Sequence, residues 1–95
     1  MQKGDREMIR QYSLAKDGNR KLAPSFNTRE FRCRDGTDTI LVDEALTVVL
    51  QCIREHFGKA VTITSGYRTA AHNAAVGRAK SSQHLLGRAA DIQVA

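Results

Sequence analysis

The sequence contains no tryptophan, only one proline and only two cysteines. Its aromatic residues are three phenylalanines and two tyrosines. The 15 Lys and Arg residues are spread along the chain without aromatic residues between them, which argues against a stacking platform for single-stranded nucleic acid. The net charge of +5 attracts polyanions only weakly, whether nucleic acid or an anionic cell wall. We therefore expect no nucleic-acid partner.

Long apolar runs are also missing. No stretch approaches the roughly 20 apolar residues that cross a bilayer, and the N-terminus lacks the apolar segment of a secretory signal. We expect neither a membrane span nor a signal peptide. Cys33 and Cys52 lack the CxxC spacing of a zinc knuckle or redox motif, which leaves two reduced, partly buried thiols or a disulfide open.

What the chain does have is the composition of one small globular domain, with 95 residues, 41% of them hydrophobic. Residues 1–25 are polar and rich in Lys, Asp, Gly and Asn, which predicts a polar N-terminal arm before a domain at 26–95. Apolar residues at helical spacing predict a helix from Asp43, a good N-cap, to Gly58, a good C-cap.

Shorter elements follow that helix. Alternation of apolar and β-branched polar residues predicts a strand over 60–65, and Thr69 is suited to cap a short helix that ends near Gly77. Alternation at 89–94 predicts a last strand, with Asp91 on the face opposite to Ile92.

His84 and Asp91 are the candidate metal ligands of the sequence. A catalytic zinc ion takes about three protein ligands from His, Asp, Glu or Cys and keeps one position open for water. If Gly87 turns the chain back, the histidine in the loop and the aspartate on the polar face of the strand converge. On spacing alone, a surface histidine and a strand-end aspartate explain the pattern as well.

The surrounding string is far more specific. Ser82-x-His84-x-x-Gly87-x-Ala89-x-Asp91 matches the SxHxxGxAxD signature, and the chain resembles zinc peptidases of the M15 family, the D-Ala-D-Ala carboxypeptidases. Upstream, the stretch from Val61 to Thr69, which contains Ser-Gly-Tyr-Arg, and the HNxxVG string at 72–77 are also similar to that family. The resemblance implies an α+β fold shared with hedgehog signalling domains, a small antiparallel sheet flanked by helices.

The resemblance also implies residue roles. His84 and Asp91 would be two zinc ligands, and Arg68 would bind the carboxylate or polarised carbonyl of the substrate. A guanidinium suits a carboxylate because it offers a planar, permanently charged fork. A surface salt bridge is the alternative for Arg68. Ser82 would orient the His84 loop, or is an ordinary loop serine.

Two further parts of the family pattern have no counterpart in this chain. The third zinc ligand, a second histidine, and the acidic general base before it would both fall after Ala95, so neither is present. The chain would then be a truncated peptidase with little or no turnover. Alternatively, His72 or His56 supplies the third ligand, although a helix-surface position for His72 and a helix-dipole partner for His56 are the simpler interpretations. The third alternative is a non-catalytic module that binds cell-wall peptides or has a structural role.

The resulting hypothesis is a zinc-dependent carboxypeptidase or endopeptidase that acts on D-Ala-containing stem peptides of peptidoglycan, with metal-bound water as the nucleophile. Its place of action would be the bacterial cell wall, reached from the cytoplasm or carried by a phage. The last strand would leave an exposed edge through which copies of the chain can pair.

Overall fold

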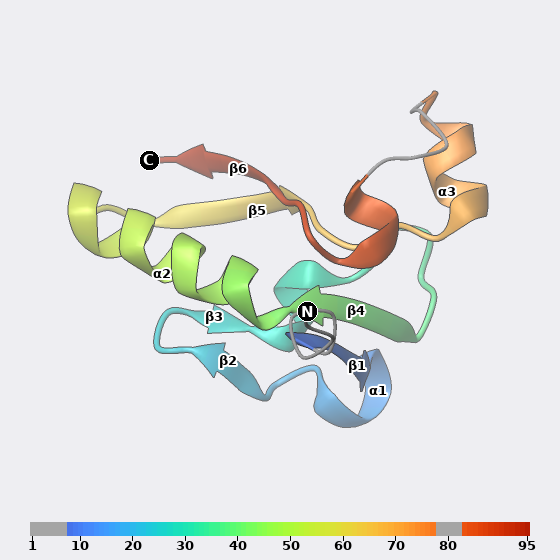
Figure 1. Cartoon of the computed structure of the whole chain (residues 1–95), viewed down its shortest axis with the longest axis horizontal. Helices are drawn as coiled ribbons and strands as arrows, with labels where there is room; N and C mark the ends of the chain where they lie inside the picture. The colour runs from blue at the N-terminus through green and yellow to red at the C-terminus, as the bar shows by residue number, and fades with distance from the viewer. Residues whose placement is uncertain (1–7, 78–82) are drawn as a thin grey trace, which may run out of the picture.

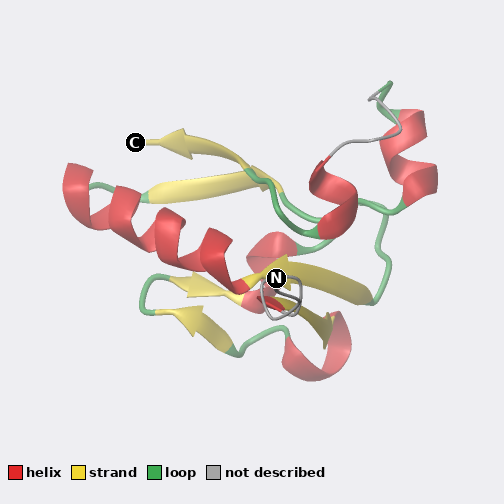
Figure 2. Ribbon diagram, in the orientation of Figure 1, coloured by secondary structure: helices red, strands yellow, loops and turns green. Residues whose placement is uncertain are grey.

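The computed structural model describes residues 8–77 and 83–95, and this part of the chain is α+β (Figures 1 and 2). Its strands form three separate antiparallel pairs, β1 with β4, β2 with β3 and β5 with β6. The strands are β1 (Ile9–Ser13), β2 (Lys21–Ala23), β3 (Phe26–Asn27), β4 (Thr39–Asp43), β5 (Val61–Ser65) and β6 (Asp91–Val94). The helices are α1 (Leu14–Asp17), α2 (Glu44–Phe57) and α3 (Ala70–Ala75), with 3-10 turns η2 (Thr28–Phe31) and η3 (Gln83–Leu86). The predicted α+β class, with small antiparallel sheets and helices, is confirmed.

Helix α2 is the longest element and begins and ends as its sequence predicts. The carboxylate of Asp43 accepts a hydrogen bond from the backbone N–H of Ala45, and Gly58 closes the helix in the left-handed conformation at φ 63°. The helix contacts β2, β4 and β5. Figure 1 shows it lying between the β5–β6 pair and the β2–β3 hairpin, so α2 joins the strand pairs.

The core explains why three short pairs remain together. Buried side chains from β3, η2, β4, α2 and β5 pack as one cluster: Phe26, Phe31, Ile40, Val42, Leu50, Val61 and Ile63. No two-stranded pair buries enough surface to be stable alone. The association of the pairs therefore depends on this shared apolar cluster.

The prediction that the chain is an irregular polar arm up to residue 25 is wrong for the described part of that segment. Strand β1 pairs with β4 along its whole length, from Ile9 opposite Asp43 to Ser13 opposite Thr39. Tyr12 and Leu22 pack against the core cluster. The polar sequence of this segment does not predict a strand, because β1 is stabilised by pairing with β4, about 30 residues later, and not by local propensity.

The β5–β6 pair carries the C-terminal end of the described chain. Val61 lies opposite Val94 and Ile63 opposite Ile92, with an irregularity before Ser65 and Asp91. Within residues 8–77 and 83–95, β6 has no second partner strand. In the same residues, no helix is both long and apolar enough to cross a membrane.

The two cysteines are free thiols, Cys33 buried and Cys52 exposed, so the alternative of a disulfide between them does not hold in this structure.

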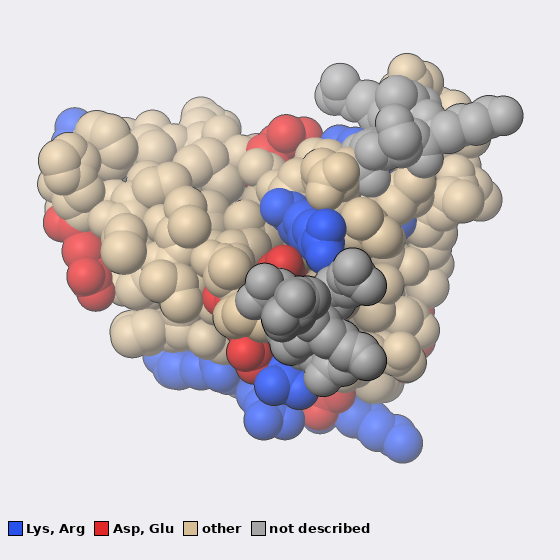
Figure 3. Space-filling model, viewed as in Figure 1, with Lys and Arg blue, Asp and Glu red and all other residues tan. Residues whose placement is uncertain are grey.

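The basic side chains are unevenly distributed over the surface. Many of the Lys and Arg side chains visible in Figure 3 gather along the lower edge of that view, over β2 and α1 and away from β6.

Candidate metal centre

A turn of η3 and the first residue of β6 bring His84 and Asp91 side by side. Nε2 of His84 lies 3.6 Å from Oδ1 of Asp91. Gly87 makes this approach possible because its left-handed conformation, at φ 73°, turns the chain back. Its carbonyl also accepts a hydrogen bond of 2.9 Å from the N–H of Asp43 at the end of β4. A side chain at Gly87 would collide with the backbone of β4. The loop that carries His84 is thus seated directly on the β4 strand.

The imidazole of His84 is oriented from behind by the backbone. Nδ1 lies 2.7 Å from the carbonyl oxygen of Gly66, and since a carbonyl only accepts, Nδ1 carries a hydrogen. In the neutral ring, Nε2 then bears the lone pair and faces Asp91. A hydrogen bond from the far nitrogen to a carbonyl is the usual support of a metal-binding histidine.

Asp91 is oriented by Arg68, which is buried in the described structure. The guanidinium donates to Oδ2 of Asp91 at 3.2 Å, to Oγ of Ser65 at 3.2 Å and to Oδ1 of Asn73 at 3.4 Å. The arginine side chain is 5% exposed, whereas that of Asp91 is 51% exposed. Arg68 therefore fixes one carboxylate oxygen from inside the protein and leaves the other directed at His84.

The separation of the two candidate ligand atoms fits one zinc ion. Zinc–nitrogen and zinc–oxygen bonds of about 2.0–2.2 Å at a tetrahedral angle put the two ligand atoms about 3.4 Å apart. The 3.6 Å between His84 and Asp91 is close to that value.

A third ligand for this pair is not found among residues 8–77 and 83–95. The one group of three or more metal-ligating side chains in that part of the chain contains neither His84 nor Asp91. His56 lies in the last turn of α2, where its ring packs edge-to-face on Phe57 at 4.9 Å. Ser82, expected to orient the loop, lies outside the described residues.

That group of three is made by Cys33, Asp35 and His72, and the sequence did not point to it. One ligand atom from each lies within 4.8 Å of the other two. His72 thus belongs to a different group from the pair it was considered for. Nothing in the spacing indicates this, because the loop with Cys33 and the helix with His72 are far apart in the sequence.

Sequence reasoning also missed the partners of the predicted residues. Ser65 and Asn73 hold the guanidinium of Arg68, and the carbonyl of Gly66 holds His84. Ser65 and Gly66 stand next to Arg68 in the Ser-Gly-Tyr-Arg string, so the string itself was the available signal. In the structure, Arg68 of this string contacts Asp91, Gly66 contacts His84, and Tyr67 packs against the core.

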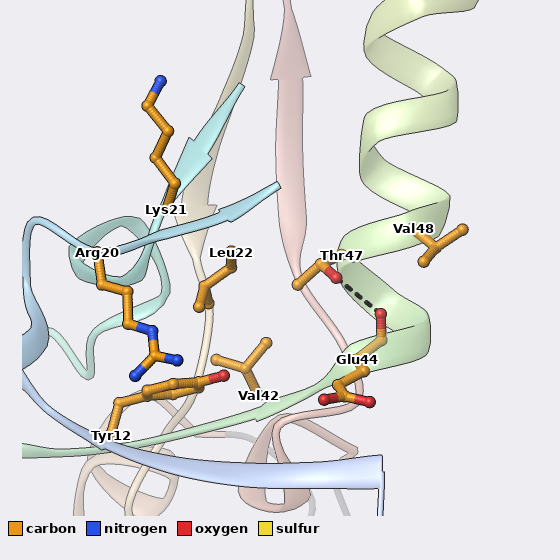
Figure 4. Close-up of a pocket in the computed structure, with 8 residues that line it drawn as sticks. All are labelled: Tyr12, Arg20, Lys21, Leu22, Val42, Glu44, Thr47 and Val48. Atoms are coloured by element: carbon orange, nitrogen blue, oxygen red, sulfur yellow. Dashed lines mark hydrogen bonds between the residues drawn. The ribbon is translucent and has the colours of Figure 1, made fainter. Parts of the chain in front are cut away.

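The pocket in Figure 4 lies elsewhere. It has a volume of about 380 Å³ and is lined by β1, β2, β4 and α2 residues and the residue before β2: Tyr12, Arg20, Lys21, Leu22, Val42, Glu44, Thr47 and Val48. The guanidinium of Arg20 lies 5.8 Å from the centre of the Tyr12 ring. No lining residue belongs to the pair, so this cavity does not bear on its chemistry.

The fold and the pair together define an α+β domain in which a buried histidine and a half-exposed aspartate share one potential cation position. The chain belongs to the peptidase M15 family, because the sequence model described as Peptidase M15 matches residues 21–95. The resemblance to that family, a family of metallopeptidases, is thereby confirmed. Comparison with curated proteins and with solved structures gave no match.

Proposed function

We propose that this chain is a zinc-dependent peptidase that hydrolyses peptide bonds beside D-Ala in the stem peptides of bacterial peptidoglycan. The observation that carries the proposal is the 3.6 Å approach of His84 Nε2 and Asp91 Oδ1, each supported on its far side. Membership of the M15 family supports the class of reaction.

His84 and Asp91 would hold the ion through Nε2 and Oδ1. Zinc bound there would supply a Lewis acid for the carbonyl and lower the pKa of water. The residues of the chain do the rest: the Gly66 carbonyl keeps the lone pair of His84 on Nε2, and Arg68 holds Oδ2 of Asp91 so that Oδ1 faces His84. Asp91 is half exposed, so ion and substrate can reach it from solvent.

Arg68 is also proposed to bind the substrate carboxylate or carbonyl. Its remaining nitrogens face Ser65 and Asn73, so a substrate would approach along the edge where the guanidinium meets Asp91.

We further propose that the enzyme acts at the cell wall, reached from the cytoplasm or carried by a phage. We also propose that β6 offers an edge through which two chains can pair.

The test is release of D-Ala from a stem pentapeptide that ends in D-Ala-D-Ala, with one equivalent of zinc. We expect slow release by the unmodified chain, since two protein ligands hold zinc weakly, and none after His84→Ala or with a chelator. His56→Ala is the matched control, because this histidine lies on α2 and should leave release unchanged. Zinc affinity is measured in parallel with a chromophoric competitor. Equal release by the unmodified chain and His84→Ala, or no release and equal zinc affinity, would refute the proposal.

A binding module is the second candidate, favoured by the finding that only two ligand atoms converge at this point in the described chain. Such a module would bind the pentapeptide without cleaving it. Calorimetry distinguishes the two candidates: a module binds the peptide equally with and without zinc and after His84→Ala.

A further inference from the structure

Cys33, Asp35 and His72 form a second cluster of potential ligands, which no step of the proposed reaction uses. Cys33 is fully buried, His72 is half-buried and Asp35 is exposed at the surface. We propose that these three side chains form a separate site for a divalent cation of the zinc class. The site does not depend on the peptidase function proposed above.

The two segments that carry the cluster are already held together without an ion. The N–H of Thr69 donates to Sγ of Cys33 at 3.4 Å, and Oγ1 of Thr69 donates to Oδ2 of Asp35 at 3.0 Å. The same Oγ1 accepts the N–H of His72 at 3.1 Å. Figure 1 shows the loop between η2 and β4 passing beside the start of α3. An ion would therefore meet ligands that are largely in place.

The donor set selects the class of cation. Thiolate sulfur together with imidazole and carboxylate is a ligand combination that zinc accepts, whereas magnesium and calcium prefer oxygen alone. Tetrahedral zinc places sulfur and nitrogen or oxygen ligands about 3.3–3.6 Å apart. The ligand atoms here lie within 4.8 Å, and the Asp35 and His72 side chains reach the surface, so rotation of these two closes the difference.

The electrostatics of the cluster also favour a cation. Hydrogen bonds from the side chain and N–H of Thr37, and from Cys33 and Thr69, hold the pKa of Asp35 well below its usual range. The thiol of Cys33 would release its proton on binding an ion. A cation would meet negative charge and no competing positive side chain among these partners.

A plain loop anchored by hydrogen bonds is the alternative explanation of these contacts, and it predicts no metal affinity. The two differ in one respect that can be measured. A cobalt ion bound to Cys33 gives the near-ultraviolet charge-transfer band of a cobalt–thiolate bond, and an ion held by His84 and Asp91 cannot give it.

The experiment is titration of the reduced 95-residue chain with cobalt, followed by displacement with zinc. We expect a thiolate band that saturates at one equivalent, disappears in Cys33→Ser and persists in Cys52→Ser, whose cysteine is exposed on α2. His72→Ala removes a half-exposed side chain and should weaken cobalt binding by more than about 100-fold, because even outer partners of metal ligands contribute 10- to 100-fold.

His84→Ala separates this site from the proposed peptidase centre, since it should abolish D-Ala release and keep the thiolate band. Absence of the band at stoichiometric cobalt would overturn the second site. A band that survives Cys33→Ser would also overturn it, as would cobalt affinity that His72→Ala leaves unchanged. The His72→Ala measurement still tests the site if the Cys33→Ser variant does not fold.

Discussion

The His84–Asp91 pair and the Cys33–Asp35–His72 cluster contain similar ligands but are supported differently. The pair is backed by groups inside the protein, the Gly66 carbonyl and the buried Arg68. The cluster is backed by Thr69 and by Thr37, which donates to Asp35, and two of its three side chains reach the surface. A ligand set supported from the interior has one geometry, and a set supported at the surface can adjust around its ion.

That difference suits different roles. A catalytic ion needs ligands held in one arrangement while substrate enters, and a structural ion mainly has to tie two segments together. The pair meets the first requirement and the cluster the second. The predictions below test the contrast, from the largest expected effect to the smallest.

Gly87→Ala should be the most damaging substitution at the pair. The new methyl group would collide with the backbone of Leu41 and Val42, and the positive φ adds strain, so we expect a loss of roughly 3–5 kcal/mol in the free energy of unfolding. Gly36→Ala, in the loop of the cluster, has φ 89° but open space around it and should lose only about 1–2 kcal/mol. Urea unfolding measures both. Equal losses would mean that the pair is not seated on β4 as described.

Arg68→Met should cost roughly 2–3 kcal/mol of unfolding free energy, because it leaves a carboxylate, a hydroxyl and an amide without their buried donor. The estimate is below the full cost of breaking a buried ion pair because Asp91 is half exposed.

Arg10→Met is the matched control for that substitution. The Arg10–Glu44 ion pair has a distance of 2.8 Å, but both side chains are about half exposed, so its loss should change the free energy by less than about 1 kcal/mol. If the two arginine variants unfold at the same urea concentration, Arg68 does not support Asp91 from the interior.

Zinc should stabilise the fold through each site separately. At a free zinc concentration of about ten times the dissociation constant, one occupied site adds about 1.4 kcal/mol by mass action. His72→Ala should remove the contribution of the cluster and His84→Ala that of the pair, as measured by thermal unfolding with and without chelator. A single substitution that removes the whole effect of zinc would show one site only.

The smallest effect concerns the acid stability of the loop that carries Cys33 and Asp35. At its end, Asp38 accepts hydrogen bonds from the Ser13 hydroxyl and the Ala15 N–H, which lower its pKa. Because the folded pKa is lowered, the stabilisation is present above the ordinary pKa of about 4 and is lost as the pH falls through the folded value.

Asp38→Asn should therefore be less stable than the unmodified chain at neutral pH and approach it in acid, as followed by urea unfolding at several pH values. Ser13→Ala removes the first donor and should change the curve in the same direction. Parallel curves for Asp38→Asn and the unmodified chain would contradict the prediction.

Much of the fold could be predicted because its signals are local. Asp43 and Gly58 delimit α2, and Thr69 caps α3 by accepting the N–H of His72, as expected from their side chains. Strand β1 could not be predicted, since its polar sequence is stabilised by pairing with distant β4. Phe57 follows the helical pattern of α2 yet is 54% exposed, because a periodic pattern does not show how far the core extends.

The same distinction holds for the sites. His84 and Asp91 lie seven residues apart within one motif, and the turn at Gly87 lets the sequence suggest that they meet. Their roles as zinc ligands, and the substrate role of Arg68, stay predictions. Cys33 and His72 come from segments that only the packing of α3 against the loop brings together, so no spacing rule could have joined them.

The dipeptide Arg68–Thr69 sits between the two regions. Its first side chain reaches Asp91, and its second residue bonds Cys33, Asp35 and His72. These two adjacent residues thus support both groups of ligands. An ion that restricts the motion of the pair would also restrict that of the cluster, and the reverse. Thermodynamic linkage then requires reciprocity: whatever factor occupancy of the cluster adds to affinity at the pair, occupancy of the pair would add at the cluster.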